Sequence, residues 1–481
     1  MKQENRKEKI EGLTVKKSNF SEWYQQVITK SGLVDYSCVS GCIILRPYAY
    51  AIWENIQKFI NKKLKASGVK NAYFPLFIPE SLLKKESEHI KGFAPEVAWV
   101  TEAGNTKLDE KLAIRPTSET IMYDTYAKWI RSWRDLPLRI NQWNTIVRWE
   151  FKHPTPFLRT REFLWQEGHS AFASHAESEK EVFEILDLYE YVYEKLLAIP
   201  VLKGKKTDKE KFPGALATYS VEPVLPDGKA IQGATSHDLG QNFAEAFNIK
   251  FLNKQGKKEY VWQTSWGLST RSIGITIITH GDDKGLIIPP AIAPNKIVII
   301  PIIYKGKEKE VLKKAKELTN KLKTFDPLLD NRKDYTAGWK FNEYELKGIP
   351  IRIEIGPKDI AKKQVVLVRR DTNKKEFVKE KDIVKKIEKT LGDIQQTLYN
   401  KAKKFVESRI VKAKNIKEIE KAIKQGKIVF ANWCGSKKCE EQVKSKTQAK
   451  SLNIPFKQQA KGKCAICGRP AKYQIYFGKS Y

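Results

Sequence analysis

The amino-acid sequence predicts three domains of mixed structure: a large α+β domain with an antiparallel sheet flanked by helices, an α/β domain, and a small α+β domain. Three observations support this prediction. The chain has 481 residues, which exceeds one ordinary hydrophobic core and suggests roughly three domains. A Pro-rich segment at 289–294 separates successive strand patterns from alternating strand and helix patterns. Beyond residue 395 the chain is rich in Lys and holds four of its six cysteines.

Helical periodicity and turn residues indicate the N-terminal elements. Residues 1–15 form a polar tail, and residues 47–67 are predicted to form a helix because Pro47 suits its first position and Gly68 its end. The apolar face of this helix would consist of Ile52, Ile56, Phe59, Ile60 and Leu64. An apolar run at 69–78 predicts a strand, which Pro75 would confine to a sheet edge or a bulge. A second helix is expected after residues 115–118 and would end near Trp133.

From Thr145 the sequence changes to the two-residue period of a β-strand. Ile146, Arg148 and Glu150 would lie on one face of a first strand. After a loop at 153–159, a second strand would place four side chains on one face: Phe163, Trp165, Glu167 and His169. Charged side chains on the buried face of a sheet need partners, and a bound ligand is the simplest partner.

The remaining elements complete the first domain and define the second. A helix at 177–198 is followed by a Lys-rich loop, residues 228–235, a helix from Leu239, and a closing segment at 261–280. Beyond the Pro-rich segment, strands are expected at 296–303, 349–355 and 365–370, and helices at 306–322 and 379–398. This alternation predicts an α/β domain.

The charge distribution favours a polyanionic partner. The chain has 88 Lys and Arg against 56 Asp and Glu, a net charge of +32. Residues 296–481 contain 47 basic and 21 acidic residues, so the excess is concentrated in the second half. Lys enrichment for solubility or for high temperature is the alternative. The sequence shows no secretion signal and no run of about 18 apolar residues, so a cytoplasmic protein is expected.

Four cysteines have the spacing of a metal site: Cys434, Cys439, Cys464 and Cys467. In a chain without a secretion signal, this pattern predicts one structural Zn²⁺ held by four thiolates rather than disulfides. Reduced structural cysteines are the alternative. Cys38 and Cys42 lie far from this group in the sequence and are predicted to be small core residues.

Arginines on or beside the predicted strands indicate phosphate and carboxylate binding. The chain contains no Gly-rich phosphate loop, which argues against P-loop and dinucleotide folds. Arg148, Arg159 and Arg271 could instead hold these oxygens bidentately and stabilise charge on a transferring phosphorus. Any one of them could also be a structural ion pair.

The sequence resembles class II aminoacyl-tRNA synthetases along nearly its whole length. Similarity to the three signatures of that class lies at 41–60 (with Pro47), at 148–163 and in Gly-Leu-Ser-Thr-Arg at 267–271. Three further segments are similar to prolyl-tRNA synthetases of the archaeal and eukaryotic type: Arg-Pro-Thr-Ser-Glu at 115–119, Phe-Leu-Trp-Gln-Glu-Gly-His at 163–169 and Gln-Gly-Ala-Thr-Ser-His at 232–237. The resemblance implies a class II catalytic domain at 16–290, an anticodon-binding domain at 291–395 and a C-terminal zinc-binding domain at 396–481.

The resemblance also implies a reaction and a set of site residues. A homodimer would activate L-proline with ATP, accompanied by Mg²⁺, and transfer it to the 3′ end of tRNA(Pro). Arg148 and Arg271 would be catalytic. Proline would be bound by Thr117, Glu119, Arg148 and His237, with Trp165 beside its ring. ATP would be bound by Arg148, Glu150, Arg159, Thr160, Gln232, Thr235, Ser269 and Arg271, with Phe163 stacked on the adenine.

Two other functions are open at this point. A threonyl or histidyl enzyme would share the class signatures, but residues 117–119 and 232–237 argue against it. An RNA-binding paralogue without activity would be expected to lack signature arginines, and all three are present.

Two further expectations concern recognition and fidelity. Arg352 and Glu354 would share one face of a strand, where they could bind anticodon guanines, with a surface ion pair as the alternative. Bacterial-type relatives carry an editing domain between the second and third signatures. Arg148 and Arg271 are only 123 positions apart, so no such domain is expected between them.

Overall fold

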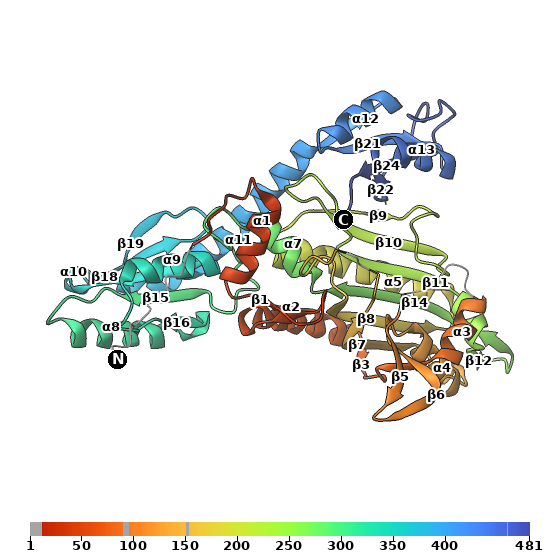
Figure 1. The fold of residues 1–481 in the computed structure, drawn as a ribbon, viewed down its shortest axis with the longest axis horizontal. Coiled ribbons are helices and arrows are strands. Elements are labelled where there is room, and N and C mark those ends of the chain that lie inside the picture. The colour runs from red at the N-terminus through yellow and green to blue at the C-terminus, as the bar shows by residue number, and fades with distance from the viewer. Residues whose placement is uncertain (1–11, 90–95, 151–152, 459) are drawn as a thin grey trace.

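The computed structural model describes residues 12–89, 96–150, 153–458 and 460–481, which form three bodies (Figure 1). The largest body surrounds an eight-stranded sheet, the second contains β15 to β19, and the third contains α12 and α13. Helix α11 (Ile383–Arg409) runs from the second body to the third (Figure 1). Among the described residues, no helix combines the length and apolar character that crossing a membrane requires.

The large domain is built on one mixed but mainly antiparallel sheet. Its strand order is β23 (Ile454–Pro455), β9 (Val201–Lys205), β10 (Ala217–Pro223), β11 (Ala234–Gly240), β14 (Trp262–Ser269), β8 (Glu162–Phe172), β7 (Leu138–Val147) and β3 (Lys70–Asn71). Every neighbouring pair is antiparallel except β3 and β7. The predicted antiparallel sheet flanked by helices is therefore confirmed.

Helices cover this sheet, and those at 47–66, 119–129, 175–191 and 242–247 fall where the sequence predicts helices, whereas those at 20–30, 80–89 and 271–280 were not predicted. They are α1 (Phe20–Lys30), α2 (Pro47–Ala66), α3 (Glu80–His89), α4 (Glu119–Trp129), α5 (His175–Tyr191), α6 (Asn242–Phe247) and α7 (Arg271–His280). Helix α2 begins with Pro47 in its first turn, as expected, and buries Ile52, Ile56, Ile60 and Leu64. Helix α5 begins at a capping box formed by Ser174 and Glu177, and it packs against β8, β10, β11 and β14.

Several predicted elements differ in extent from the observed ones. The run at 69–78 forms two short strands in different sheets, β3 and β4 (Phe77–Pro79), and Pro75 lies between them. Leu239 belongs to β11, so the predicted helix begins later, at Asn242. Strand β7 ends at Val147, so Arg148 and Glu150 do not lie on it. The Arg148 N–H still donates to Arg161 O, the residue opposite it in the β7–β8 register, whereas the Trp149 N–H donates to Glu96 O and leaves the ladder.

Some short, exposed strands were not predicted. They are β1 (Val34–Tyr36), β2 (Ile43–Leu45), β5 (Trp99–Ala103), β6 (Thr106–Ile114), β12 (Lys250–Leu252) and β13 (Lys258–Tyr260). Most of their side chains are exposed or half-buried, which removes the apolar alternation that identifies a strand. The prediction that Cys38 and Cys42 are core residues is wrong, because Cys38 is exposed and Cys42 half-buried on the β1–β2 connection.

The second domain contains a five-stranded sheet in the order β16 (Pro327–Leu329), β15 (Ile297–Pro301), β17 (Ile351–Ile355), β18 (Gln364–Arg369) and β19 (Lys375–Lys379). Its helices are α8 (Glu308–Lys321), α9 (Ala337–Lys347), α10 (Pro357–Ala361) and the first part of α11. Helix α11 continues past its predicted end because Ala402 and Val406 extend its buried face, and it crosses residue 395, where a domain boundary is expected.

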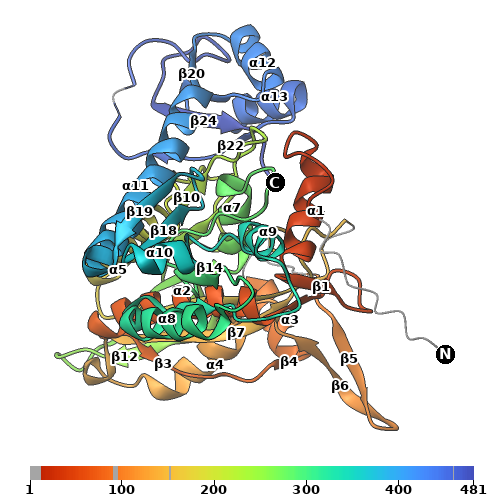
Figure 2. The same cartoon turned by 90° about the vertical axis from the view of Figure 1, so that its left-hand side faces the viewer.

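The third domain follows α11. It has a four-stranded sheet, in the order β20 (Ile410–Ala413), β21 (Ile428–Trp433), β24 (Tyr473–Gly478) and β22 (Lys450–Ser451), with helices α12 (Ile416–Lys424) and α13 (Lys437–Thr447). Figure 2 shows these elements stacked at one end of the molecule, above β10 of the large sheet. Strand β23 belongs to this part of the chain but forms the edge of the large sheet, so the two domains share a sheet.

Candidate functional site

A cavity of about 310 Å³ opens over the large sheet. Its walls come from β8, β11 and β14, from the segment before α4, and from the connection between β9 and β10. The predicted site residues that line it are Thr117, Glu119, Arg148, Phe163, Trp165, Gln232, Thr235, His237, Ser269 and Arg271. Residues far apart in the sequence are thus brought into one cavity.

Sheet register explains this convergence. Across β10, β11, β14 and β8, the residues Thr218, His237, Ser265 and His169 are successive cross-strand partners. A second such row contains Thr235, Gly267 and Glu167. Because the members of each row lie side by side and alternate residues share a face, both rows present polar groups on the cavity side.

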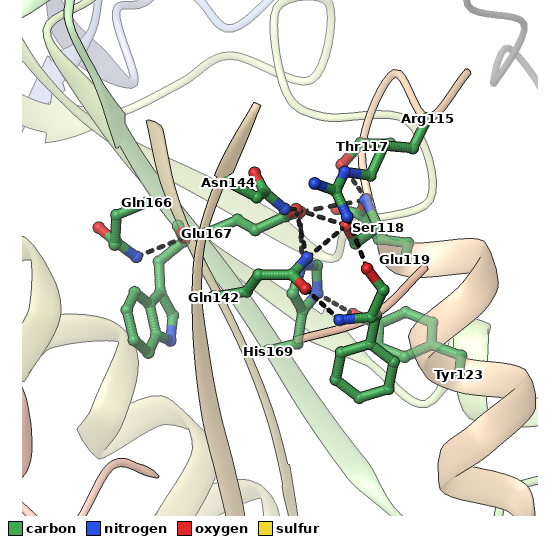
Figure 3. A network of polar contacts seen from close by, with 12 residues as sticks. Arg115, Thr117, Ser118, Glu119, Tyr123, Gln142, Asn144, Gln166, Glu167 and His169 are labelled. Atoms are coloured by element: carbon green, nitrogen blue, oxygen red, sulfur yellow. Dashed lines mark hydrogen bonds and ion pairs between the residues drawn. The ribbon is translucent and has the colours of Figure 1, made fainter. Parts of the chain in front are cut away.

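A buried polar network forms the floor of one end of the cavity (Figure 3). The Glu167 carboxylate accepts hydrogen bonds from Ser118 N–H (3.0 Å) and Asn144 Nδ2 (2.6 Å), and it lies 3.0 Å from His169 Nε2. Burial raises the pKa of Glu167, but hydrogen bonds from His169 and Ser118 and the His169 charge outweigh it and hold that pKa below its usual value. Burial lowers the pKa of His169, but the charges of Glu119 and Glu167 raise it overall. The charged forms of Glu167 and His169 are therefore favoured.

Glu119 adds a second carboxylate at the same end. It is the first residue of α4, is 4% exposed, and accepts a hydrogen bond from the Thr117 hydroxyl. Two carboxyl groups, of Glu119 and Glu167, therefore stand at this end beside one imidazole, that of His169. This end suits a cationic group of a ligand.

His237 stands beside this acidic end. Burial, reinforced by the charge of His169, lowers its pKa to about 3, so the imidazole is neutral near pH 7. Its Nδ1 lies 2.9 Å from the Thr218 hydroxyl, and its ring centroid lies 4.8 Å from that of Phe212. A neutral imidazole can form a hydrogen bond here without repelling a bound cation.

Two arginines add positive charge to the cavity lining. Arg148 is oriented by a hydrogen bond from Nε to Pro116 O (2.9 Å), and Arg271 by bonds to Leu158 O (3.0 Å) and Gln232 O (3.1 Å). Burial lowers the pKa of Arg271 to about 10, and the charges of Arg148 and Arg159 act in the same direction. Within the described residues, neither Arg148 nor Arg271 forms an ion pair, so both can bind an anion.

Aromatic rings lie between the two ends. The Arg148 guanidinium carbon is 5.8 Å from the Phe163 ring centroid and 5.6 Å from that of Trp165. The two rings meet edge to face, with centroids 6.1 Å apart. These flat apolar surfaces can contact a planar base or a small ring.

Three predicted ATP-binding residues lie outside this lining: Glu150, Arg159 and Thr160. Glu150 is exposed and Thr160 is buried, and both belong to the connection between β7 and β8. Arg159 is close enough to Arg271 to affect its pKa. The early end of β7 explains the placement, because this connection leaves the sheet at Arg148.

Other lining residues were not predicted as site residues. Glu167 and His169 were placed on the correct face of β8, where a ligand was expected to accompany charged side chains, but neither was assigned a role. Glu210, Lys211, Phe212 and Pro213 belong to the Lys-rich loop. A loop residue has no periodicity, so its position relative to the sheet could not be inferred.

The hypothesis for Arg352 and Glu354 is not supported by their contacts. Both are 8% exposed on β17, and the Arg352 guanidinium bonds Glu354 (3.0 Å) and Glu345 (3.1 Å). The Phe341 ring centroid lies 4.1 Å from the guanidinium carbon. The ion-pair alternative is therefore favoured, although the pair is buried rather than on the surface.

The four C-terminal cysteines converge on one point. Their sulfur atoms all lie within 4.8 Å of one another, and Cys434 Sγ is 3.6 Å from the sulfurs of both Cys439 and Cys467. Four thiolates around a tetrahedral Zn²⁺ would have sulfurs about 3.8 Å apart, so the spacing fits this metal. Gly468 has a φ of +74°, which forms the turn that brings Cys464 and Cys467 together.

Comparisons with known proteins agree with this arrangement. The model of the class II tRNA synthetase core domain (G, H, P, S and T) matches residues 99–280, that of the anticodon-binding domain 296–390, and that of the prolyl-tRNA synthetase C-terminal domain 416–481. The chain is 49% identical over 481 residues to the proline–tRNA ligase of Natranaerobius thermophilus, with 99% of each chain covered. It is 51% identical over 479 residues to proline–tRNA ligase 2 of Bacillus cereus (strain ZK / E33L), covering 99% of this chain and 100% of the relative.

Proposed function

Since the chain belongs to the prolyl-tRNA synthetase family, we propose that its cavity activates L-proline with ATP and then transfers the prolyl group to the 3′ end of tRNA(Pro). One observation carries this proposal most directly. The cavity has a negative end around Glu119 and Glu167 and a positive end around Arg148 and Arg271, which matches a zwitterionic amino acid lying beside ATP.

The acidic end would bind the amino group. The Glu119 carboxylate, oriented by the Thr117 hydroxyl, would face the secondary ammonium of proline. His237, held neutral, would contact the same end, and Trp165 would lie beside the pyrrolidine ring. Glu167 and His169 would add electrostatic support without direct contact.

The arginine end would position the reacting groups. Arg148 would hold the proline carboxylate next to the α-phosphate, so that a carboxylate oxygen attacks the α-phosphorus in line. The new bond forms prolyl-adenylate, and the bond between the α-phosphorus and pyrophosphate breaks. Arg148 and Arg271 would stabilise the charge that develops on the phosphoryl oxygens, and the Mg²⁺ that accompanies ATP would neutralise the pyrophosphate.

The remaining ATP contacts extend from this centre. Phe163 would stack on the adenine, with the Arg271 guanidinium on the opposite face. Gln232, Thr235 and Ser269 would contact the ribose and phosphates. Glu150 would accept from the adenine amino group, and Arg159 and Thr160 would hold the outer phosphates. These last three lie outside the cavity lining, so their roles require ATP to extend over the β7–β8 connection.

Amino-acid-dependent exchange of pyrophosphate into ATP tests this function. We expect exchange with proline and none comparable with threonine or histidine, which the alternative members of the class would use. An absence of exchange with every amino acid, in protein that still binds tRNA, would instead favour a tRNA-binding paralogue.

The C-terminal part of the chain, beyond residue 295, would bind tRNA. Residues 296–481 contain 47 basic and 21 acidic residues, and phosphate contacts supply much of the affinity for nucleic acids. The anticodon-binding domain would contact the anticodon region. The four-cysteine cluster would hold one structural Zn²⁺, since four thiolates leave no coordination position open for catalysis.

A homodimer in the cytoplasm is the proposed state of the enzyme. Exposed apolar side chains occur on the β1–β2 hairpin and at the start of α2: Tyr36, Val39, Ile44 and Tyr50 are 43–58% exposed. Ile44 is paired with Asp35 and Tyr36 with Ile43, so Ile44 and Tyr36 lie on opposite faces of the hairpin, and Ile44 offers an apolar surface that a second chain could cover. Ile44→Asp should therefore convert a dimer to monomers in sedimentation analysis, and a dimer that survives the substitution would contradict this interface.

A further inference from the structure

The connection between β9 and β10, residues 206–216 (here the 206–216 loop), forms one wall of the cavity. Glu210, Lys211, Phe212 and Pro213 line it. The Phe212 N–H donates to the Thr218 hydroxyl (2.9 Å), which in turn bonds His237 Nδ1 (2.9 Å). The Phe212 ring also packs on the His237 ring, so the loop orients a residue proposed to contact proline.

The outer side of this loop contacts the third domain. The Thr207 hydroxyl lies 3.4 Å from that of Ser451, and both side chains are buried. The Glu440 carboxylate of α13 is 4% exposed and lies near these two hydroxyls, but neither of its buried oxygens forms a hydrogen bond with a described residue. Two residues after Thr207, Lys209 Nζ forms an ion pair with Glu441 of α13 (3.5 Å).

A single segment of the third domain, residues 450–456, also fixes the strand that precedes the loop. Ile454 and Pro455 of β23 pair with Lys205 and Gly204 of β9. A Cβ at Gly204 would lie 2.3 Å from the Ile454 carbonyl oxygen, so only glycine permits this approach. Asn453, fully buried, donates from Nδ2 to Leu202 O (2.8 Å).

The large domain holds mainly the far half of the loop. Leu216 N–H donates to Asp238 O (2.8 Å), and Asn242 Nδ2 donates to Gly214 O (2.8 Å). Phe212 is also anchored in the large domain, through its N–H bond to Thr218 and a stacked contact with Phe243 (centroids 6.2 Å apart). At Thr207 and Lys209 the side-chain contacts come from the third domain, so the near half of the loop depends on both domains for its position.

We propose that the third domain is a positioning part of the amino-acid site. Helix α13 and residues 450–456 hold the 206–216 loop in place, and the loop holds Phe212 and thereby His237 at the proline end of the cavity. The inference rests on the proposed function, because it assigns the loop to the affinity for proline. Cys439 lies on α13 next to Glu440, so the proposed metal would also hold this helix in position.

Thr207→Val tests the contact, because it keeps the side-chain shape and removes only the hydroxyl. In pyrophosphate exchange without tRNA, we expect the KM for proline to rise about five- to tenfold, the range that loss of one or two buried hydrogen bonds gives. The KM for ATP and kcat should stay within about twofold, because the arginine end is untouched. Ser451→Ala should act in the same way from the other side of the interface.

Two matched controls separate positioning from general damage. Thr207→Ser keeps the hydroxyl and should keep the parental KM for proline. Ser445→Ala changes an exposed hydroxyl of α13 whose hydrogen bond is to Gln442 O of the same helix, and it should have no effect. Trypsin should cut Thr207→Val faster than the parent at Lys209 or Lys211, and proline with ATP should slow that cleavage.

The outcomes are distinct. An unchanged KM for proline in both Thr207→Val and Ser451→Ala, with parental melting temperatures, would overturn the inference. Equal rises in KM for proline and ATP, or a loss confined to kcat, would also overturn it, because they indicate general damage. A parent enzyme without proline-dependent exchange would refute the proposed function, and this inference with it.

Discussion

Arg148 is the residue on which the proposed chemistry depends most. One guanidinium, fixed by Pro116 O and bordered by Phe163 and Trp165, would bridge two anions that otherwise repel each other. Arg148→Ala should therefore lower kcat/KM for pyrophosphate exchange by about 10³-fold or more. The fold should be intact, since this side chain makes one backbone contact and no ion pair within the described residues. Arg134→Ala, at an exposed position away from the cavity, is the control, and near-parental exchange by a folded Arg148→Ala protein would contradict the assignment.

Site residues could be predicted where a motif or a strand period fixed them, and not where tertiary packing did. Alternation along one strand placed Phe163 and Trp165 on a shared face. The family resemblance indicated that both, with Thr117, Glu119 and His237, would lie at the cavity, and all five line it. Phe212 could not be predicted, because its place on His237 depends on a loop held by a distant domain. The contacts of Arg352 could not be predicted, because α9, which supplies Glu345 and Phe341, was not predicted.

At the scale of elements, α7 connects the cavity to the second domain. It begins with Arg271 at the cavity and ends at His280, and the next residues include Asp282, which forms a bidentate ion pair with Arg370 (2.6 and 2.9 Å). Lys17 Nζ donates to Ile278 O and Gly281 O at the same helix end (2.6 Å each). Cationic groups at a helix C-terminus are favourable, so this end is held from two domains.

His280 makes the stability of this helix end depend on pH. Burial lowers its pKa to about 4, and Lys17 and Lys401 act in the same direction, whereas the unfolded chain titrates near 6.5. Below pH 6.5 the unfolded state therefore binds a proton that the folded state does not, and stability falls as pH decreases toward 4. This residue alone should cost up to about 3 kcal/mol between pH 7 and 4. The free energy of unfolding in urea should therefore decrease less between pH 7 and pH 4 for His280→Gln than for the parent. Equal decreases in both proteins would disprove the assignment.

Metal binding by the four-cysteine cluster can also be tested directly. Cys439 and Cys464 are also part of the apolar core of the third domain, so metal loss should loosen that core. Metal analysis should find about one Zn²⁺ per chain, and Cys434→Ser should abolish binding and lower the melting temperature. Cys38→Ser, which changes an exposed cysteine outside the cluster, should retain the metal. Full zinc content in Cys434→Ser would rule out this ligand set.

Elements with a strong period or a clear cap could be predicted well, as α2 and the antiparallel sheet show. Their ends were less certain, because hydrogen bonds to distant loops decide where a strand stops, as at Val147 of β7. Exposed hairpins such as β5–β6 lack the burial that gives a strand its apolar alternation. The addition of β23 to the large sheet could not be inferred either, since a two-residue strand has no pattern.

At the scale of the whole molecule, the three domains act on one cavity from different sides. The large domain supplies its floor and both charged ends, the second holds α7 through Arg370, and the third supports the 206–216 loop. Most of the excess positive charge lies in residues 296–481, the part of the chain proposed to bind tRNA. The activation site instead combines acidic and basic side chains. Activation should therefore depend on the third domain even when tRNA is absent.

The absence of a second hydrolytic domain between Arg148 and Arg271 sets a limit on accuracy. Throughout residues 153–271, the described chain forms strands of the large sheet, the small β12–β13 hairpin, and helices or loops packed on them, as the sequence led us to expect. Alanine is smaller than proline, and a pocket rejects a smaller apolar side chain by only about 1–3 kcal/mol for each missing methylene. We therefore expect measurable alanine-dependent pyrophosphate exchange.

The consequence for the tRNA product can be measured separately. Alanine that reaches tRNA(Pro) should stay attached, because no part of the described interval offers a separate site for hydrolysing the ester. Purified enzyme mixed with alanyl-tRNA(Pro) should release alanine no faster than the spontaneous rate, while prolyl-tRNA(Pro) serves as the reference ester. Rapid enzyme-dependent release would reveal a hydrolytic site elsewhere in the chain, and Arg148→Ala would then show whether the activation cavity itself carries it out.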